Sequence, residues 1–133
     1  GDLDNLLLLP YQPYERLSEV LAAADVLVAI LEPDAGIFSV PSKVLSYLCA
    51  GRPLLAAMPA ENLAARIIQR EAAGLVAAPD DSAGLLRLAA RLVDHPDLRA
   101  QCAKNALDYA QQTFDIEVIG ARFESLIRPL VPV

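Results

Sequence analysis

The run Ser39-Val40-Pro41-Ser42-Lys43 brings a hydroxyl and an ammonium group to the expected start of a helix. Residues 44–50 have a short helical pattern, Gly51 is expected to end that helix, and Ser42 is expected to be its N-cap. Free N–H groups at a helix start, the positive end of the helix dipole, a hydroxyl and a cation can together hold a phosphate group. The alternative is that Ser42 only caps the helix and that Lys43 is a solvated surface residue.

Other patterns for chemistry are weak in this sequence. It contains no Gly-x-Gly-x-x-Gly fingerprint, no Gly-Lys-Ser/Thr phosphate loop and no Gly-x-Ser-x-Gly elbow. The one histidine, His95, has no credible nucleophile to activate, and with the distant Cys49 and Cys102 it offers too few ligands for a metal site. We expect the two cysteines to be buried free thiols in a reducing cytoplasm, with one disulfide as the alternative.

Composition sets the class of protein. The chain has 133 residues, of which 55% are hydrophobic, and this predicts one folded domain over residues 1–133. A net charge of −6 leaves no basic stripe for a nucleic acid, so DNA and RNA are not expected partners. No apolar run approaches the roughly 18–20 residues that cross a bilayer, and no signal peptide is visible. We therefore expect a cytoplasmic protein with no transmembrane segment.

The elements that would position the phosphate site alternate along the chain. Apolar runs predict strands at 6–9, 26–30, 53–57 and 74–77, and helical patterns occupy 14–24, 44–50, 62–71, 83–94, 97–113 and 115–128. Asn62 and the run Asp80-Asp81-Ser82 are predicted helix caps. This alternation predicts an α/β fold with a Rossmann-like, doubly wound parallel sheet of about four strands, helices on both faces and a helical C-terminus. Ligands of such folds bind in the loops at the carboxyl ends of the strands, here 10–13, 31–42 and 58–61.

Four stretches of the sequence carry a family resemblance. They are residues 9–17 with 22–26, the run Val-Pro-Ser-Lys-Val-Leu-Ser-Tyr-Leu-Cys-Ala-Gly-Arg-Pro at 40–53, residues 71–81, and residues 94–99 with 109–114. In their order and spacing they resemble the carboxyl-terminal, donor-binding domain of the retaining family 4 glycosyltransferases, which have the two-Rossmann-domain architecture called GT-B. The similarity is greatest to the subgroup that includes fucosamine and colanic-acid transferases.

The resemblance implies roles for individual residues. The helix-start amides, Ser42 and Lys43 would face the donor diphosphate, and the segment Ser39 to Pro41, with Val40 between them, would lie near the transferred sugar. The family usually has two glutamates separated by seven residues, and their positions here are Phe38 and Ser46. Ser46 would take the place of the glutamate that holds the ribose.

Two further residues are placed by the resemblance. Tyr11 and Gln12 fall where the family often touches the base. The resemblance assigns no catalytic side chain in this sequence.

The resemblance also implies the reaction and its partners. A UDP- or GDP-sugar would donate its sugar, with retention at the anomeric carbon, to a glycan or lipid-linked acceptor in bacterial surface-polysaccharide synthesis. No metal or other cofactor would be required, because helix ends and basic side chains stabilise the leaving diphosphate. The full-length protein could associate peripherally with the inner face of the plasma membrane. The family's amino-terminal acceptor domain and its first strand–helix unit have no counterpart in these residues.

The last helix of the family crosses back to the acceptor domain. Its apolar face in this chain, formed by Val118, Phe123, Leu126 and Ile127, is therefore expected to be exposed and to be able to mediate a homodimer.

Two other interpretations stay open. A nucleotide-sugar 2-epimerase-like fragment would share the architecture, but the acidic and histidine residues on which those enzymes depend cannot be placed here. A non-catalytic Rossmann-like interaction or signalling module is the other alternative. A receiver-type module needs clustered acids after its first strand, where this chain has Pro10, Tyr11 and Gln12.

We predict that the 133-residue chain alone has no transferase activity, because the acceptor domain and the basic strand–helix unit of the family have no counterpart in it. A donor-hydrolysis and sugar-transfer assay on the purified chain checks this prediction. Robust turnover of a nucleotide sugar would show that the prediction is wrong.

Overall fold

Three parallel strands form one open sheet in the computed structural model, which describes residues 3–34 and 41–130. The strands are β1 (Leu27–Ile30), β2 (Leu54–Ala57) and β3 (Gly74–Ala77), in the order β1-β2-β3. Leu54 of β2 is in register with Leu27 on one side and with Gly74 on the other. The predicted α/β fold with a parallel sheet is confirmed, and the described residues hold three of the four predicted strands.

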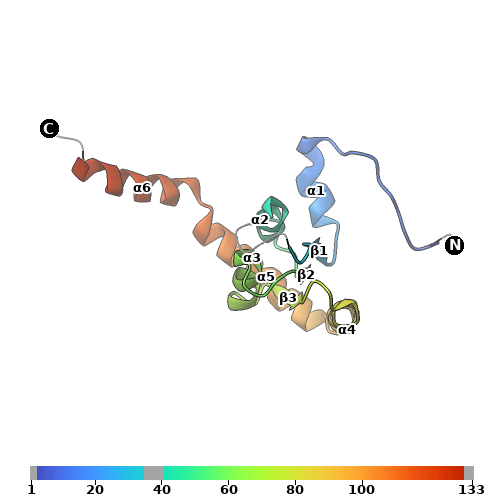
Figure 1. Cartoon of the computed structure of the whole chain (residues 1–133). Coiled ribbons are helices and arrows are strands. Elements are labelled where there is room, and N and C mark those ends of the chain that lie inside the picture. Colours follow the sequence, from blue (N-terminus) through green and yellow to red (C-terminus); the bar gives the residue numbers. More distant parts are fainter. Residues whose placement is uncertain (1–2, 35–40, 131–133) are drawn as a thin grey trace.

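The predicted strand at residues 6–9 is wrong in this structure. These four leucines have no strand neighbour, and their side chains are exposed, Leu7 at 78% and Leu8 at 82%. The segment runs away from the sheet beyond the first helix (Figure 1). A continuous apolar run indicates a tendency to be buried, but it becomes a strand only where a neighbouring strand supplies hydrogen-bond partners.

Helices connect the strands and complete the chain. A 3-10 turn at Tyr14–Arg16 precedes α1 (Leu17–Ala22), so the single helix predicted at 14–24 is divided. The others are α2 (Ser42–Cys49), α3 (Leu63–Arg70), α4 (Ser82–Asp94), α5 (Pro96–Thr113) and α6 (Ile116–Ile127), followed by a 3-10 turn at Arg128–Leu130. The chain breaks between α4 and α5 at His95, as predicted, because Pro96 opens the second helix. None of the described helices is long and apolar enough to cross a membrane.

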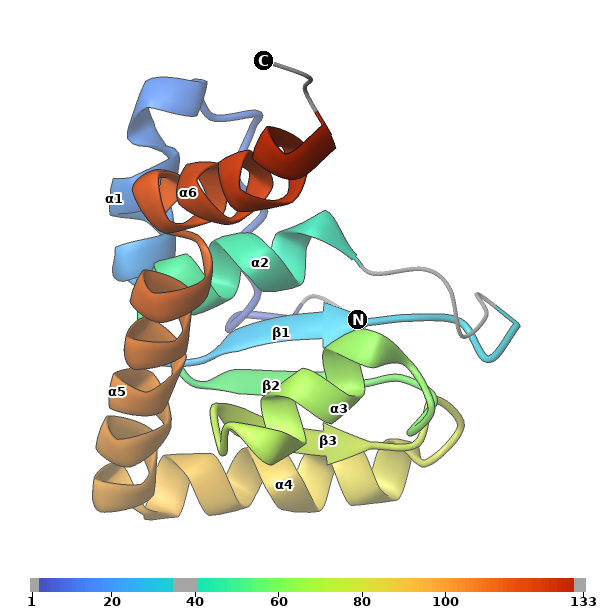
Figure 2. The same ribbon diagram turned by 90° about the vertical axis from the view of Figure 1, so that its left-hand side faces the viewer.

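The helices cover both faces of the sheet, as predicted. Helices α2 and α3 pack on one face and α4 packs on the other (Figure 1). Helix α5 runs across the ends at which the strands begin, roughly perpendicular to them (Figure 2). The core between these layers is made mostly of small and branched apolar side chains, among them Val44, Leu48, Leu54, Ala56, Ile68 and Ala106.

Strand β1 is covered on one face only. Leu27 and Ala29 are buried, whereas Val28 and Ile30, which point to the other face, are 46% and 56% exposed. The reason is that α4 packs on β2 and β3. The face of β1 that carries Val28 and Ile30 is therefore not covered by a described helix.

The glycine that begins β3 allows β3 to approach β2 closely. A Cβ atom built on Gly74 would lie 2.0 Å from the carbonyl oxygen of Leu54. Gly120, on α6, is the opposite case, because nothing lies within 4 Å of a Cβ atom built there.

We predict that Gly74→Ala lowers the free energy of unfolding by about 1–3 kcal/mol, because the methyl group forces the two strands apart. Gly120→Ala should raise the free energy of unfolding by up to about 1 kcal/mol, since alanine favours the helix over glycine. Equilibrium urea denaturation of the two variants measures both changes. Equal stability of the two variants would contradict the close approach of β2 and β3.

Candidate functional site

The loops that follow the three strands meet at the carboxyl end of the sheet. They lead from β1 to α2, from β2 to α3 and from β3 to α4, and all three strands point the same way (Figure 2). Two of the predicted ligand loops, 31–42 and 58–61, lie at this end. The structure describes residues 31–34 and 41–42 of the first loop, and Ser39 and Val40 lie outside the described residues.

Two of the three helix starts at this end are closed by their own side chains. The Asn62 side chain is fully buried and accepts a hydrogen bond from the backbone N–H of Ala64 at 2.8 Å. The Asp81 carboxylate accepts a hydrogen bond from the N–H of Gly84 at 2.7 Å. Both caps were predicted. Each cap gives a backbone N–H group of the first turn of its helix, α3 or α4, a hydrogen-bond partner within the chain.

The start of α2 differs from the other two. Ser42 was predicted to be the N-cap, but it is the first residue of the helix, and Pro41 is the N-cap, with φ −64° and ψ 120°. The apolar ring of Pro41 accepts no hydrogen bond, so the first turn of α2 has no side-chain cap. The side chains of Ser42 and Lys43 are exposed at this turn. Among the described residues, α2 is therefore the one helix following a strand whose first turn has no side-chain cap.

Lys43 supplies the positive charge at the start of α2. Lys43 is the one basic residue among residues 31–34, 41–44, 58–63 and 78–83, and exposed acids accompany it, including Asp34, Glu61 and Asp80. The chain has one other lysine, Lys104, which forms an ion pair with Asp108 on α5. An anion at the start of α2 would therefore depend on Lys43 for its nearest positive charge.

Ser46 lies one turn further along α2 and is half-buried. It lines a groove of about 550 Å³ between α1 and α2. The groove is mostly apolar, and its lining includes Tyr14, Leu17, Leu21, Leu45 and Cys49. Sequence reasoning missed this groove, because no local pattern shows that α1 lies beside α2.

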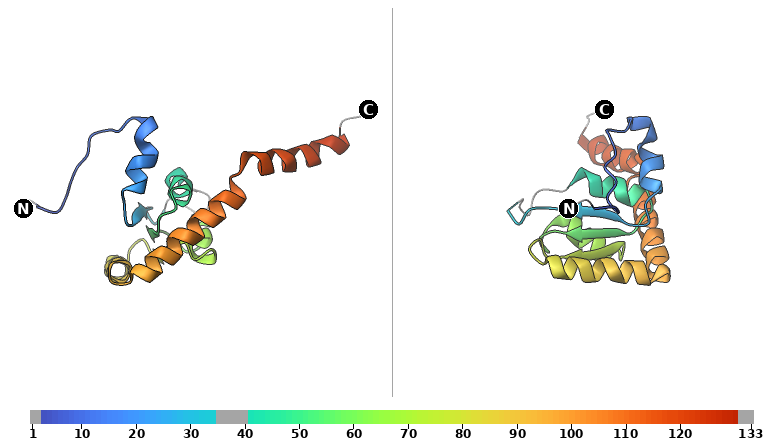
Figure 3. Two further views of the ribbon diagram at one scale, coloured as in Figure 1. Left: turned by 180° about the vertical axis from the view of Figure 1, so that it is seen from behind. Right: turned by 90° about the vertical axis from the view of Figure 1, so that its right-hand side faces the viewer.

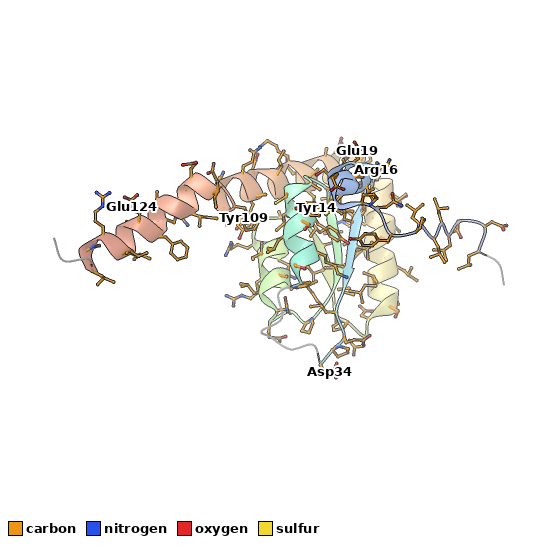
Figure 4. All side chains as sticks on the ribbon, turned by 90° about the horizontal axis from the view of Figure 1, so that it is seen from above. Tyr14, Arg16, Glu19, Asp34, Tyr109 and Glu124 are labelled. Carbon is orange, nitrogen blue, oxygen red and sulfur yellow. The ribbon has the colours of Figure 1, made fainter. Side chains whose placement is uncertain are left out.

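Tyr11 and Gln12 are not brought to the start of α2. Tyr11 is 92% exposed, and the Gln12 side-chain amide donates a hydrogen bond to the carbonyl of Pro10. Figure 4 places the nearby Tyr14 and the loop residue Asp34 at opposite ends of α2. In Figure 2, too, α1 lies near the ends at which the strands begin. The base contact expected for Tyr11 and Gln12 stays a prediction.

The two cysteines are both free thiols, so the alternative of a disulfide is wrong. Cys102 is buried, as expected, whereas Cys49 is exposed at the groove between α1 and α2. Partial burial raises the pKa of the Cys49 thiol, and burial also raises the pKa of Cys102 against a smaller opposing effect of Arg91. A raised pKa keeps a thiol protonated, which makes Cys49 a poor nucleophile.

Comparisons with known proteins add no assignment. Neither the family models, nor the curated proteins, nor the solved structures produced a match to this chain. Residues 3–34 and 41–130 also hold no group of three or more side chains that could bind a metal ion.

We predict that the two kinds of helix start respond differently to alanine. Asp81→Ala removes a cap and should lower the free energy of unfolding by about 1 kcal/mol. Ser42→Ala should change it by less than about 0.5 kcal/mol, because this exposed side chain caps nothing. Urea denaturation of the two variants checks the contrast, and a loss of stability in Ser42→Ala as large as that in Asp81→Ala would refute it.

Proposed function

We propose that this chain is the donor-binding part of a retaining glycosyltransferase and that the diphosphate of a nucleotide sugar binds at the start of α2. The observation that carries the proposal is the uncapped first turn of α2 beside Lys43, at the end of a parallel sheet where two neighbouring helices are closed by their own caps. The family resemblance of residues 40–53 supports a nucleotide diphosphate sugar as the anion.

The proposed chemistry is stabilisation of a leaving group. When the bond between the anomeric carbon and the diphosphate oxygen breaks, negative charge develops on the phosphate. Backbone N–H groups of the first turn of α2 and the Ser42 hydroxyl would donate hydrogen bonds to the phosphate oxygens, and the Lys43 ammonium would balance the charge. These donors are held in place by the helix, so little reorganisation is required as the charge develops.

The rest of the proposed reaction follows from the resemblance. The donor would be a UDP- or GDP-sugar, and the acceptor a glycan or lipid-linked sugar of a surface polysaccharide. The acceptor would be bound by another part of a longer protein. Ser46, in place of a glutamate of the family, would contact the ribose from the second turn of α2.

Nucleotide binding tests the proposal, and the two lysines of the chain provide a matched pair. Titration with UDP, GDP and UDP-sugars, followed by two-dimensional amide NMR, should shift the signals of Ser42 and Lys43. Lys43→Gln should weaken binding by about tenfold, as expected for the loss of a charge-assisted hydrogen bond. Lys104→Gln removes the same charge from α5, where Lys104 is paired with Asp108, and should leave the affinity unchanged.

Two outcomes would contradict the proposal. One is the absence of any shift at millimolar nucleotide, which would favour a non-catalytic module. The other is an equal loss of affinity in Lys43→Gln and Lys104→Gln, because that result would indicate a general charge effect rather than a site at α2.

A further inference from the structure

The segment before α1 exposes an unusual amount of apolar surface. All four side chains of Leu6–Leu9 are exposed large hydrophobics. The backbone hydrogen bond recorded for this segment, from the N–H of Leu6 to the carbonyl of Leu3, stays within residues 3–9. We name residues 3–9 the arm. Its leucines and its unpaired backbone groups have the properties of a strand without a sheet.

A place for a strand exists at the open edge of the sheet. Strand β1 pairs with β2 on one side, and no described residue pairs with its other side. An open edge presents a row of N–H and carbonyl groups on which a further strand can form. On the uncovered face of β1, Val28 and Ile30 add apolar surface to this edge. The edge and the leucine run both span four residues.

The arm and the β1 edge of the same chain are not paired with each other in the described structure. Pro10 and Pro13 restrict the backbone between the arm and α1, and the residues before them, Leu9 and Gln12, prefer an extended conformation. Pro13 itself is extended, with φ −56° and ψ 144°. Figures 1 and 3 show the arm continuing away from the sheet beyond α1. The arm is thus extended, exposed and without a hydrogen bond to the rest of the described chain.

We propose that two copies of this chain exchange arms, so that residues 6–9 of each copy add a strand to the open edge of β1 in the other. A reciprocal exchange is symmetric, and exchange of an identical element is an inexpensive route to a dimer. It pairs the backbone groups of the arm and of β1 and places leucine side chains beside Val28 and Ile30 on the same face of the sheet. The proposal concerns the β1 edge and does not depend on nucleotide binding at α2.

The test is the oligomeric state of the full chain and of variants on each side of the interface. Sedimentation velocity from low micromolar to high micromolar concentration should show a monomer–dimer equilibrium. Leu8→Lys on the arm and Val28→Lys on the edge should each weaken dimerisation by at least about tenfold, since each places a charge in an apolar contact. Leu63→Lys on α3, a partly exposed leucine on the face of the sheet opposite to Val28 and Ile30, should leave the dimer unchanged.

Two further measurements keep the result independent of misfolding. Far-UV circular dichroism confirms that each variant is folded. A chain that begins at Pro10 removes only the arm, which makes no hydrogen bond to the rest of the described chain, and it should be folded and monomeric. Hydrogen exchange should also show that the backbone amides of β1 become more protected as the concentration of the full chain rises.

Each remaining outcome overturns the proposal. A full chain that is monomeric throughout the concentration range leaves the arm unpaired or folded onto its own sheet. A dimer that survives both lysine variants, or the removal of the arm, uses another surface, such as the exposed apolar face of α6. Unchanged exchange of the β1 amides on dimerisation would show that the arm binds elsewhere.

Discussion

The burial of β2 is the constraint on which the rest of this structure depends. All four of its residues, Leu54 to Ala57, are buried, and it pairs with a strand on each side. Helices lie on both of its faces, so it has no contact with water that could satisfy its backbone groups. The small side chains of Ala56 and Ala57 allow those helices to pack closely. The absence of a side chain at Gly74 allows β3 to do the same.

Because β2 is closed on all sides, the free backbone groups of this part of the fold lie at the carboxyl end of the sheet. There the three following helices begin, and their N–H groups have to find partners in side chains, water or a ligand. Asn62 and Asp81 provide partners at α3 and α4 and so contribute to stability. At α2 a proline occupies the cap position, and this first turn is left to solvent or to a ligand. Side-chain caps therefore stabilise two of the helix starts at this edge, and the third has none among the described residues.

Several segments outside the core expose apolar side chains. Helix α6 buries none of its residues and extends from the body, with Glu124 far out along it (Figure 4). The arm and one face of β1 are exposed as well. Exposed apolar surface costs about 25 cal/mol per Å² in water. Burying these surfaces against another molecule would therefore be favourable. The predicted exposure of Val118, Phe123, Leu126 and Ile127 is confirmed, whereas the homodimer through α6 stays a prediction.

Much of this fold was predictable from the sequence because its signals are local. Runs of apolar residues with period-breaking prolines and glycines located three strands and their helices to within a few residues. Asn62 and Asp81 marked helix starts by their own chemistry, and Pro96 marked the break between α4 and α5. Gly51 ended α2 with a positive φ of 60°. At the candidate site, the position of Ser42 and Lys43 at a helix start after a strand was also predictable, since it follows from the same local pattern.

Other features required the tertiary structure. The leucine run at 6–9 has the composition of a strand, but a strand needs a neighbour, and no local pattern shows whether one is available. The same limit applies to Ser46, whose groove exists only because α1 lies beside α2. It applies to Cys49 as well, which was expected to be a buried thiol and is exposed. The sequence by itself therefore determined most of the segments that form helices and strands, and where α2 starts. Only the tertiary structure decided which edges and faces are covered, because burial depends on contacts between segments far apart in the chain.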